Sequence, residues 1–455
     1  MAWRQRTAAF LEELKHLGTR PSLKEVERLM SLRLREWQRT PKAAGQVLQD
    51  LKRMKRADLV CQLLDVWERG PGHARPEPLH YATAISACAA AKWWQRAIAI
   101  FHSLPEASIE PSVIHYNATM SACEKGRQWQ VGLQLFDVMP KAHTAPDIIS
   151  YSSAISCCEK GSQWNFALGL FNTMCTSKLT PDDIVYNATI SSCDKGGRWQ
   201  LALDVFHSMA TRALRPDTIS FNATISACKR AGEWQLALQL FSGIAAATLS
   251  PTVVSYSAAI SSCEVQGLWQ MALFLFHSMQ EATLAPDVIS CSSLLSSCEK
   301  GGQWQLALHV FNSMPAMKLT PDNITYNAAI TSCEKGAQWQ AALTLFRSMP
   351  SVQLVPNLIG YNTTISSCEK GGEWTLALEI FSALQRSRIS PDVISYNAAI
   401  SACEKCSRWA AALELFASIP RARLEPNVVS YRAVLGSSTL VRTIKTHGVP
   451  AEDPR

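Results

Sequence analysis

Small polar residues recur at two places along the chain with a constant spacing of 35 residues, and their side chains could hydrogen bond to a ligand that itself repeats. The first place holds Asn or Ser in nine of ten copies, and the second holds Asp in six of ten. An amide donates and accepts hydrogen bonds, whereas a carboxylate only accepts them, so the two places together can distinguish ligand groups. A large aliphatic residue and a basic residue recur in the same register.

Tryptophan and cysteine define this register. Ten Trp residues, from Trp94 to Trp409, and ten Cys residues, from Cys88 to Cys403, follow one another at 35-residue steps. Units counted from the residue after a recurring Pro and polar pair run from 78–112 to 393–427. Two degenerate copies, 8–42 and 43–77, come first and are interpreted as an N-terminal cap, and a partial copy opens at Val428 before the tail to 455. Fixed-period self-similarity indicates one repeat array rather than the roughly three globular domains that the length of 455 residues suggests.

Each unit is expected to form two helices. In unit 113–147 the first dozen residues form one helix and Trp129 to about Met139 a second, with Gly126 breaking between them. At 100° per residue, unit positions 4 and 11 share one face of the first helix and positions 2, 5 and 13 share the opposite face. Neither helix can bury its apolar stripe alone, so the units must stack into an all-α superhelix.

The face with positions 2, 5 and 13 does not have the composition of a core. Position 2 is Ile or Val after Leu79: Ile114, Ile149, Ile184, Ile219, Val254, Ile289, Ile324, Ile359 and Ile394. Position 5 is polar after Ala82: Asn117, Ser152, Asn187, Asn222, Ser257, Ser292, Asn327, Asn362 and Asn397. Position 13 is basic in eight units: Lys125, Lys160, Lys195, Arg230, Lys300, Lys335, Lys370 and Lys405. Position 35 after Ser112 holds Asp147, Asp182, Asp217, Thr252, Asp287, Asp322, Asn357, Asp392 and Asn427.

These rows have two interpretations. An apolar side chain flanking a base, a polar pair at the base edge and a cation at the phosphate would suit single-stranded nucleic acid. Alternatively, Asn and Asp cap helices and Lys forms a solvated face, as in a solenoid that binds a protein. Net charge does not decide between them, because the ten units carry 24 basic and 25 acidic residues.

The cysteine and tryptophan rows are expected to be packing residues. Copies of position 11 should lie about 10 Å apart, which is too far for a disulfide bond. The only Cys-x-x-Cys pair, Cys403 and Cys406, has no second pair to complete a zinc site, so no metal or other cofactor is expected.

The sequence strongly resembles the P-class of the pentatricopeptide repeat family. The resemblance lies in the 35-residue period, the V-[IV]-S-Y-N-A-A-I-S-[AS]-C-E-K-G opening, the A-L-x-L-F-x-S-M second helix and the L-x-P-D close, and it covers residues 78–427 well. It implies a right-handed superhelical α-solenoid that binds single-stranded RNA at about one base per repeat. It also implies a mitochondrial or chloroplast role in RNA processing, stability or translation, by occupancy or by recruiting an enzyme, although residues 1–18 do not resemble an ordinary transit peptide.

The resemblance assigns bases to the pairs at positions 5 and 35. In the family, Asn at position 5 goes with pyrimidines and Ser with purines, while Asp at position 35 goes with U and G. Asn117/Asp147, Asn187/Asp217 and Asn362/Asp392 are then U readers; Ser152/Asp182, Ser257/Asp287 and Ser292/Asp322 are G readers; Asn222/Thr252, Asn327/Asn357 and Asn397/Asn427 take a pyrimidine (Y). The implied site, read 5′ to 3′, is N-U-G-U-Y-G-G-Y-U-Y.

No catalytic centre is expected in this sequence. Some relatives append a nuclease or a deaminase, but the 28 residues after 427 contain one His, His447, and neither an H-x-E nor a C-x-x-C motif. The ten His residues are scattered without metal-ligand spacing. No stretch of about 18 apolar residues predicts a membrane span. We therefore expect a monomeric, non-enzymatic binder of U/G-rich RNA, with a protein-protein scaffold as the alternative.

Overall fold

The computed structural model describes residues 10–14, 25–29, 41–69, 76–177 and 179–435, and every regular element among them is a helix. The all-α prediction is therefore confirmed. The chain divides into two compact units, Met1–Ala231 and Gly232–Arg455. Residues 1–9 and 15–18 of the amino-terminal stretch, and the tail beyond 435 with His447, lie outside the described residues.

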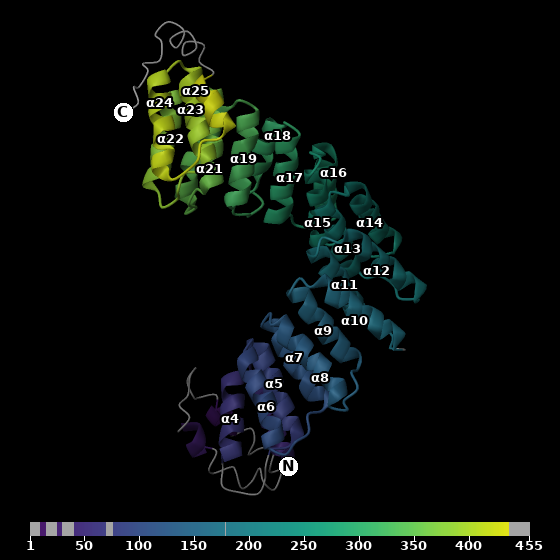
Figure 1. Cartoon of the computed structure of the whole chain (residues 1–455). Coiled ribbons are helices and arrows are strands. Elements are labelled where there is room, and N and C mark those ends of the chain that lie inside the picture. Colours follow the sequence, from purple (N-terminus) through teal and green to yellow (C-terminus); the bar gives the residue numbers. More distant parts are fainter. Residues whose placement is uncertain (1–9, 15–24, 30–40, 70–75, 178, 436–455) are drawn as a thin grey trace, which may run out of the picture. The chain divides into compact units, whose positions relative to one another are not determined.

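The first compact unit, Met1–Ala231, is a series of helical hairpins (Figure 1). Short helical stretches at 10–14 and 25–29 are followed by α3 (Pro41–Arg53) and α4 (Ala57–Arg69). The first helices of the regular repeats, here called A helices, are α5 (Pro78–Ala91), α7 (Val113–Lys125), α9 (Ile148–Lys160), α11 (Asp183–Lys195) and α13 (Thr218–Ala231). The second, or B, helices are α6 (Trp94–Glu106), α8 (Trp129–Lys141), α10 (Trp164–Thr176) and α12 (Trp199–Thr211).

The second compact unit, Gly232–Arg455, continues the same alternation of A and B helices. Its A helices are α15 (Val253–Glu264), α17 (Val288–Lys300), α19 (Asn323–Lys335), α21 (Leu358–Lys370), α23 (Val393–Lys405) and α25 (Val428–Leu435). Its B helices are α14 (Trp234–Ala246), α16 (Trp269–Glu281), α18 (Trp304–Ser313), α20 (Trp339–Ser348), α22 (Trp374–Arg386) and α24 (Trp409–Ser418), with 3₁₀ turns at η1 (Met349–Val352) and η2 (Pro420–Ala422).

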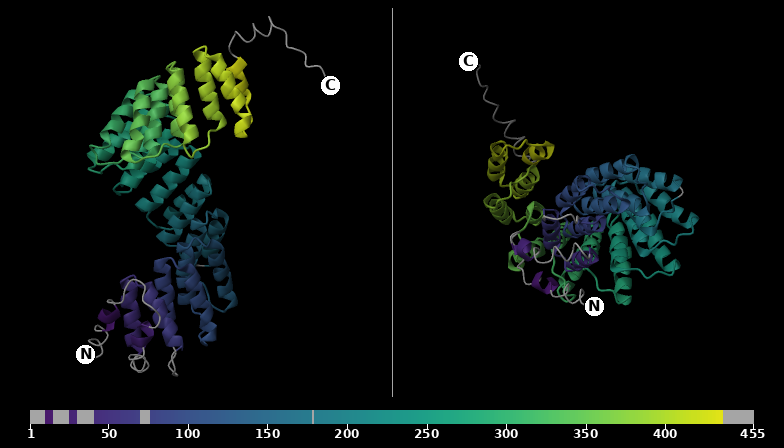
Figure 2. Two further views of the ribbon diagram at one scale, coloured as in Figure 1. Left: turned by 90° about the vertical axis from the view of Figure 1, so that its left-hand side faces the viewer. Right: turned by 90° about the horizontal axis from the view of Figure 1, so that it is seen from below.

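Within each unit the helices form two layers. Each A helix packs against the A helix of the next repeat and against the B helix of its own, and the B helix also contacts the following A helix (Figures 1 and 2). From residue 78 onward the A helices begin within one residue of the expected unit start, and each B helix begins at the recurring Trp. The degenerate hairpin α3 and α4 begins at Pro41 rather than at 43, so it is two residues out of register.

The first helix of repeat 113–147 ends at Gly126, as the sequence predicted: α7 stops at Lys125 and Gly126 is its C-cap. Gly126 nevertheless keeps a helical φ of −82°, and the next residue, Arg127, takes the left-handed conformation with φ 56°. The glycine is required for another reason: a Cβ on Gly126 would lie 2.5 Å from Cδ1 of Trp94. In six repeats the Trp that opens the B helix packs in this way on a glycine in the turn of the following repeat, and its close approach there leaves no room for a side chain. The equivalent turn residue is Ala231 after Trp199, Gln266 after Trp234 and Cys406 after Trp374.

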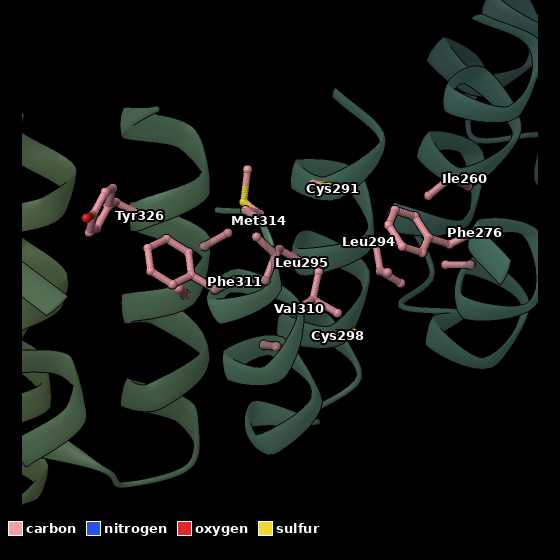
Figure 3. Packing of buried hydrophobic residues seen from close by; sticks show 14 of the residues in the cluster. Ile260, Phe276, Cys291, Leu294, Leu295, Cys298, Val310, Phe311, Met314 and Tyr326 are labelled. Carbon is pink, nitrogen blue, oxygen red and sulfur yellow. The ribbon is translucent and has the colours of Figure 1, made fainter. Parts of the chain in front are cut away.

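A second contact between repeats is aromatic. In eight repeats the Phe of the B helix meets the Tyr at position 4 of the next repeat edge to face. Phe136 and Tyr151 have ring centroids 4.9 Å apart, and Phe311 and Tyr326 have ring centroids 4.8 Å apart, the latter pair being drawn in Figure 3. In the other two repeats position 4 is Phe221, which meets Phe206 in the same way, and Cys291. Such pairs contribute about 0.5–1.5 kcal/mol each beyond the burial of their area. The position 11 cysteines, from Cys88 to Cys403, are free thiols buried beside these rings, which confirms their prediction as core residues.

The tight fit of Trp94 against Gly126 predicts opposite effects for two Gly→Ala substitutions. G126A should lower the free energy of unfolding by about 1–3 kcal/mol through overpacking. G169A, in the middle of α10 where an added Cβ meets nothing within 4 Å, should raise it by about 0.5–1 kcal/mol. Thermal unfolding followed by circular dichroism measures both, and a G126A midpoint equal to that of wild type would refute the packing role.

Candidate functional site

The Ile and Val residues at position 2 are exposed to solvent. Ile114, Ile184 and Ile324 show 61%, 63% and 63% of their surface, and the other six members of the row lie between 58% and 63%. Since A helices of successive repeats pack side by side, these side chains form a continuous apolar row along the A layer of each unit. Large apolar side chains exposed in a row, rather than singly, indicate a surface that contacts a ligand.

The residue at position 35 caps the A helix of the next repeat. Asp147 Oδ1 accepts a hydrogen bond from the backbone N–H of Ser150 at 2.8 Å, and Asp392 does the same for Ser395 at 2.8 Å. Asn357 caps α21 through the N–H of Gly360 at 3.0 Å. The capping interpretation of this row is therefore correct, and it fixes the position of the side chain.

The same capping residues also contact position 5 of the preceding A helix, 30 residues earlier. Asn117 Nδ2 donates to Asp147 Oδ1 at 3.0 Å, Asn362 Nδ2 to Asp392 Oδ1 at 3.1 Å, and Ser257 Oγ to Asp287 Oδ1 at 3.1 Å. The further pairs Asn187/Asp217, Asn327/Asn357 and Asn397/Asn427 are joined in the same way at 3.1–3.4 Å. Six of the nine pairs named from the sequence are thus in direct contact, next to the exposed apolar row.

Three pairs differ. Ser292 Oγ donates to the carbonyl of Ile289 in its own helix at 2.9 Å, and Ser152 makes no hydrogen bond to Asp182 among the described residues. Asn222 and Thr252 belong to different units, so their relation is not described. Within the described residues, the pairs Ser152/Asp182 and Ser292/Asp322 therefore lack the direct hydrogen bond that joins position 5 to position 35 in the six pairs above.

A third polar row was not identified from the sequence. At position 3, the hydroxyls of Ser150, Ser395 and Ser430 donate to Oδ1 of the position 5 Asn of the preceding repeat at 2.6–2.7 Å. These serines are fully buried at the helix start. The Ser that recurs in the V-[IV]-S-Y opening is visible in the sequence, but the Asn it bonds to lies 33 residues earlier, so the sequence pattern does not reveal the contact.

Hydrogen bonds keep the capping carboxylates ionised. Burial raises the pKa of Asp147, but the bonds from Ser150 and Asn117 outweigh it and hold the pKa below its ordinary value. The pKa values of Asp217 and Asp392 are lowered by the same balance. These groups therefore present acceptor oxygens at neutral pH.

Four asparagines carry a buried Oδ1 with no hydrogen-bond partner among the described residues: Asn187, Asn222, Asn323 and Asn327. Two of them, Asn187 and Asn327, belong to the hydrogen-bonded pairs described above. Both are paired with position 35 through Nδ2 only. Such an acceptor is costly in a folded protein and marks a place where the side chain has a further use.

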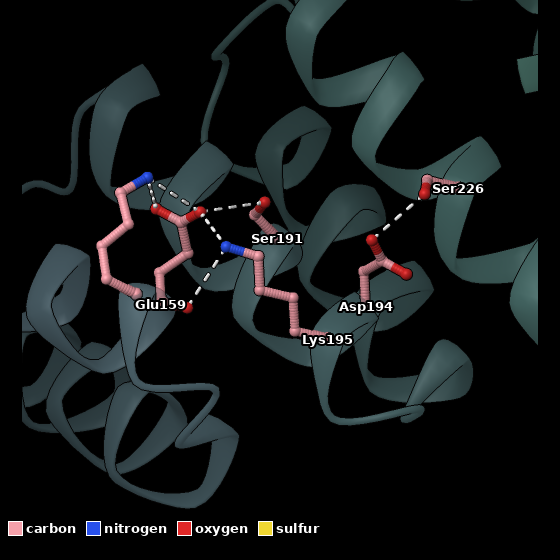
Figure 4. A network of polar contacts seen from close by, with 6 residues as sticks. Glu159, Ser191, Asp194, Lys195 and Ser226 are labelled. Carbon is pink, nitrogen blue, oxygen red and sulfur yellow. Dashed lines mark hydrogen bonds and ion pairs between the residues drawn. The ribbon is translucent and has the colours of Figure 1, made fainter. Parts of the chain in front are cut away.

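Seven of the eight basic residues at position 13 are ion-paired, six of them with an acid at position 12 of the preceding repeat. Lys195 Nζ lies 2.7 Å from Glu159 Oε1 (Figure 4), and Arg230 Nε lies 3.0 Å from Asp194 Oδ1. Lys300, Lys335, Lys370 and Lys405 form the same inter-repeat pairs at 2.9–3.5 Å. Ser191 and Ser226 add hydrogen bonds to the acids at 3.5 and 3.1 Å (Figure 4). Seven of the eight cations predicted for phosphate contact are therefore already balanced by neighbouring acids.

The described part of the chain contains no group of three or more His, Cys, Asp and Glu side chains arranged to hold a metal ion. No described helix has the length and apolar character that crossing a membrane requires.

Comparison with known families follows the same repeats. A "pentatricopeptide repeat domain" model matches residues 75–126, 204–264 and 344–405, and a "PPR repeat family" model matches 286–335 and 391–437. A "PPR repeat" model matches 149–179, 184–212, 254–284 and 324–353. Together these matches cover well over half of the chain. No curated protein sequence matches it significantly.

Solved structures agree on the fold. The crystal structure of the pentatricopeptide repeat protein PPR10 from maize is 18% identical, with a TM-score of 0.53 over 94% of this chain and 80% of that one. PPR10 in complex with an 18-nucleotide psaJ RNA element is 18% identical, with a TM-score of 0.35 over 98% and 92%. Yeast Rmd9p in complex with a 16-nucleotide target RNA is 12% identical, with a TM-score of 0.34 over 100% and 97%. The first likeness shows the fold, whereas the other two superpose too loosely to support a conclusion.

The lowered pKa of Asp392 predicts how stability depends on pH. Its charge should stabilise the fold above the ordinary pKa of 3.8, and this contribution should disappear as pH falls through the lower folded-state pKa. D392N keeps a capping side chain, as Asn357 does, but removes the charge, so it should be about 0.3–1 kcal/mol less stable at neutral pH and low salt.

Chemical unfolding of wild type and D392N at pH 7 and at pH 3 measures this difference. D204N, which removes an exposed charge within α12 away from a helix start, is the control. A D392N deficit that stays unchanged on acidification would contradict the assignment.

Proposed function

The chain belongs to the pentatricopeptide repeat family, and from this membership we propose that residues 78–427 bind single-stranded RNA in a sequence-specific way, about one base per repeat. The observation that carries the proposal is the exposed Ile/Val row beside the hydrogen-bonded pairs at positions 5 and 35. An apolar side chain next to a fixed donor and acceptor matches an unstacked base, which offers a flat face and a polar edge.

The proposed site is N-U-G-U-Y-G-G-Y-U-Y, read 5′ to 3′ from repeat 78–112 to repeat 393–427. The U readers Asn117/Asp147 and Asn362/Asp392 are the best supported, because both side chains are held together by short hydrogen bonds. The G readers at Ser152 and Ser292 are the weakest, since neither serine bonds to its capping partner among the described residues. We therefore expect the third and seventh bases to be selected least strictly.

Binding is proposed to act by occupancy, as a monomer and without a cofactor. A protein bound to RNA shields it from exonucleases, alters a hairpin or recruits a processing enzyme. From the family resemblance we place this activity in a mitochondrion or chloroplast.

The ion-paired lysines set how binding depends on charge. Long-range attraction to RNA is weak when each cation has an acid beside it, so apolar contact and base-edge bonding must supply most of the affinity. We propose that Lys370 and the other position 13 cations leave the carboxylate of their ion pair when RNA binds and contact a phosphate oxygen instead.

Selection of RNA ligands from a random single-stranded pool, at a stated salt concentration, tests the proposal. Enrichment of a U/G-rich sequence near UGUYGGYUY is expected. Equal weak retention of a matched oligomer and its scrambled version would overturn sequence-specific binding and favour a scaffold for a protein partner.

Asn117→Ser should change selectivity at the second base alone. Replacing the amide with a hydroxyl, with Asp147 unchanged, converts this repeat to the Ser/Asp pair and should move preference from U towards G by about tenfold. Binding to RNAs that differ only at base 2 measures it, with Q134A on the exposed face of α8 as control. An equal loss for all RNAs would indicate a folding defect instead.

Removing one acid of the inter-repeat ion pairs at positions 12 and 13 should strengthen RNA binding. Glu334 pairs with Lys370 at 2.9 Å and accepts a bond from Ser366 at 2.9 Å. E334Q frees the cation and should raise affinity about two- to fivefold, with a change in stability below about 1 kcal/mol because the pair is partly exposed.

The matched variant K370Q should have the opposite effect. It should weaken binding and reduce the slope of log affinity against log salt by about 0.7, as expected for one lost phosphate contact on a single strand. An unchanged slope would show that Lys370 serves only the ion pair.

A further inference from the structure

We propose that the hydroxyl at position 3 of the following repeat is a third determinant of base selection, because it holds the reading Asn in the orientation that faces residue 35. This inference rests on the proposed RNA binding and extends it from a pair of residues to a triad. The residue is a positioning residue, since it acts through the Asn and is itself buried.

The triad is complete in three repeats. Ser395 Oγ lies 2.6 Å from Asn362 Oδ1 and 2.8 Å from Asp392 Oδ1, while Asn362 Nδ2 lies 3.1 Å from Asp392 Oδ1. Asn117, Asp147 and Ser150 have the same three contacts, and so do Asn397, Asn427 and Ser430. The three side chains therefore touch one another in a closed ring.

The chemistry of the ring leaves one orientation for the amide. Asp392 Oδ1 only accepts, so the Asn362 atom that faces it must be the donor Nδ2. Oδ1 then points to the Ser395 hydroxyl, which can donate to it. One amide N–H and one carbonyl lone pair remain for a base edge, a donor and an acceptor side by side that suit a pyrimidine.

In two of the described repeats the bond from position 3 to the Asn is missing. Ser220 turns its hydroxyl to Asp217 at 2.7 Å instead of to Asn187, and the bonds from Asn187 to Asp217 lengthen to 3.3 and 3.4 Å. Gly360 has no hydroxyl to offer Asn327. Asn187 and Asn327 are the two position 5 asparagines, among those hydrogen-bonded to residue 35, whose buried Oδ1 lacks a partner among the described residues. A buried acceptor without a donor disfavours the rotamer that carries it, so the reading orientation is held less firmly.

The chain contains a natural comparison between two repeats with the same pair. Asn327/Asn357 is followed by Gly360, and Asn397/Asn427 is followed by Ser430. A Cβ on Gly360 would lie 2.9 Å from Asn327 Oδ1, so a side chain there meets this amide directly. Because the pairs are identical, the inference predicts looser discrimination at the eighth base, which Asn327 faces, than at the tenth.

Removing one hydroxyl tests the inference. In the full chain, S395A should reduce the preference for U over C at the ninth base from about tenfold to below about threefold, with a smaller loss of affinity for the U9 RNA. Fluorescence anisotropy with ten-nucleotide RNAs that differ only at base 9 measures this ratio.

A matched control separates orientation from helix capping. Ser290 caps α17 as Ser395 caps α23, with Asp287 N donating to its hydroxyl at 3.0 Å, but the preceding position 5 residue is Ser257 rather than Asn. S290A should therefore cost similar stability and leave the preference for G over A at the sixth base unchanged.

Adding a hydroxyl gives the converse test. G360S should sharpen discrimination between U and C at the eighth base by at least about threefold. G360A, which adds the Cβ alone, should not. Both variants replace a helical glycine, so an effect on stability is common to them and cancels in the comparison.

The outcomes distinguish failure of the positioning role from failure of the proposed RNA binding. If wild type binds the matched RNA and S395A keeps the full U9 to C9 ratio, the positioning role is overturned while RNA binding stands. If G360A sharpens selectivity as much as G360S, bulk rather than the hydroxyl is responsible, and the inference also fails. If wild type shows no preference between matched and scrambled RNA, the proposed function itself is wrong.

Discussion

Contact between successive repeats is the constraint on which the rest of the structure depends. In six repeats the Trp that opens the B helix packs on a turn glycine of the next repeat, and in eight a Phe on the B helix meets the next Tyr edge to face. Both contacts require each hairpin to have the same length, which explains the absence of insertions from residue 78 to 427. Constant length in turn aligns equal positions of neighbouring A helices, and this alignment creates the exposed apolar row and the polar pairs.

Capping and the proposed contact with a base use the same side chain at position 35. The residues found there are Asp, Asn, Thr and Ser, all of which are favourable N-caps. The cap holds Oδ1 of Asp147 or Asp392 against the start of one helix while position 5 of the preceding helix reaches it. The two interpretations of the sequence, helix cap and ligand contact, are therefore compatible, because a side chain that caps one helix still lies beside position 5 of the preceding helix.

Charge on this surface is arranged as a ladder rather than as a positive stripe. Each position 13 cation from Lys195 to Arg230 in the first unit, and from Lys300 to Lys405 in the second, has an acid from the preceding repeat beside it. Partly exposed pairs of this kind add little stability. Their consequence is a nearly neutral surface on which apolar contact and hydrogen bonding decide what binds.

The sequence by itself determined the fold class, the hairpin period and which rows are core, because those depend on local periodicity and on residue types that repeat. It also identified positions 2, 5 and 35 as candidate binding positions. Residues of one type that recur every 35 positions on the face opposite the core can be found from the sequence alone. Only the tertiary structure decided that Gly126 serves Trp94 rather than the turn, that the lysines are paired, and that a buried serine completes the Asn and Asp pair. Each of these contacts joins residues from 30 to 36 positions apart in neighbouring repeats, and no pattern within a single helix encodes which side chains then meet.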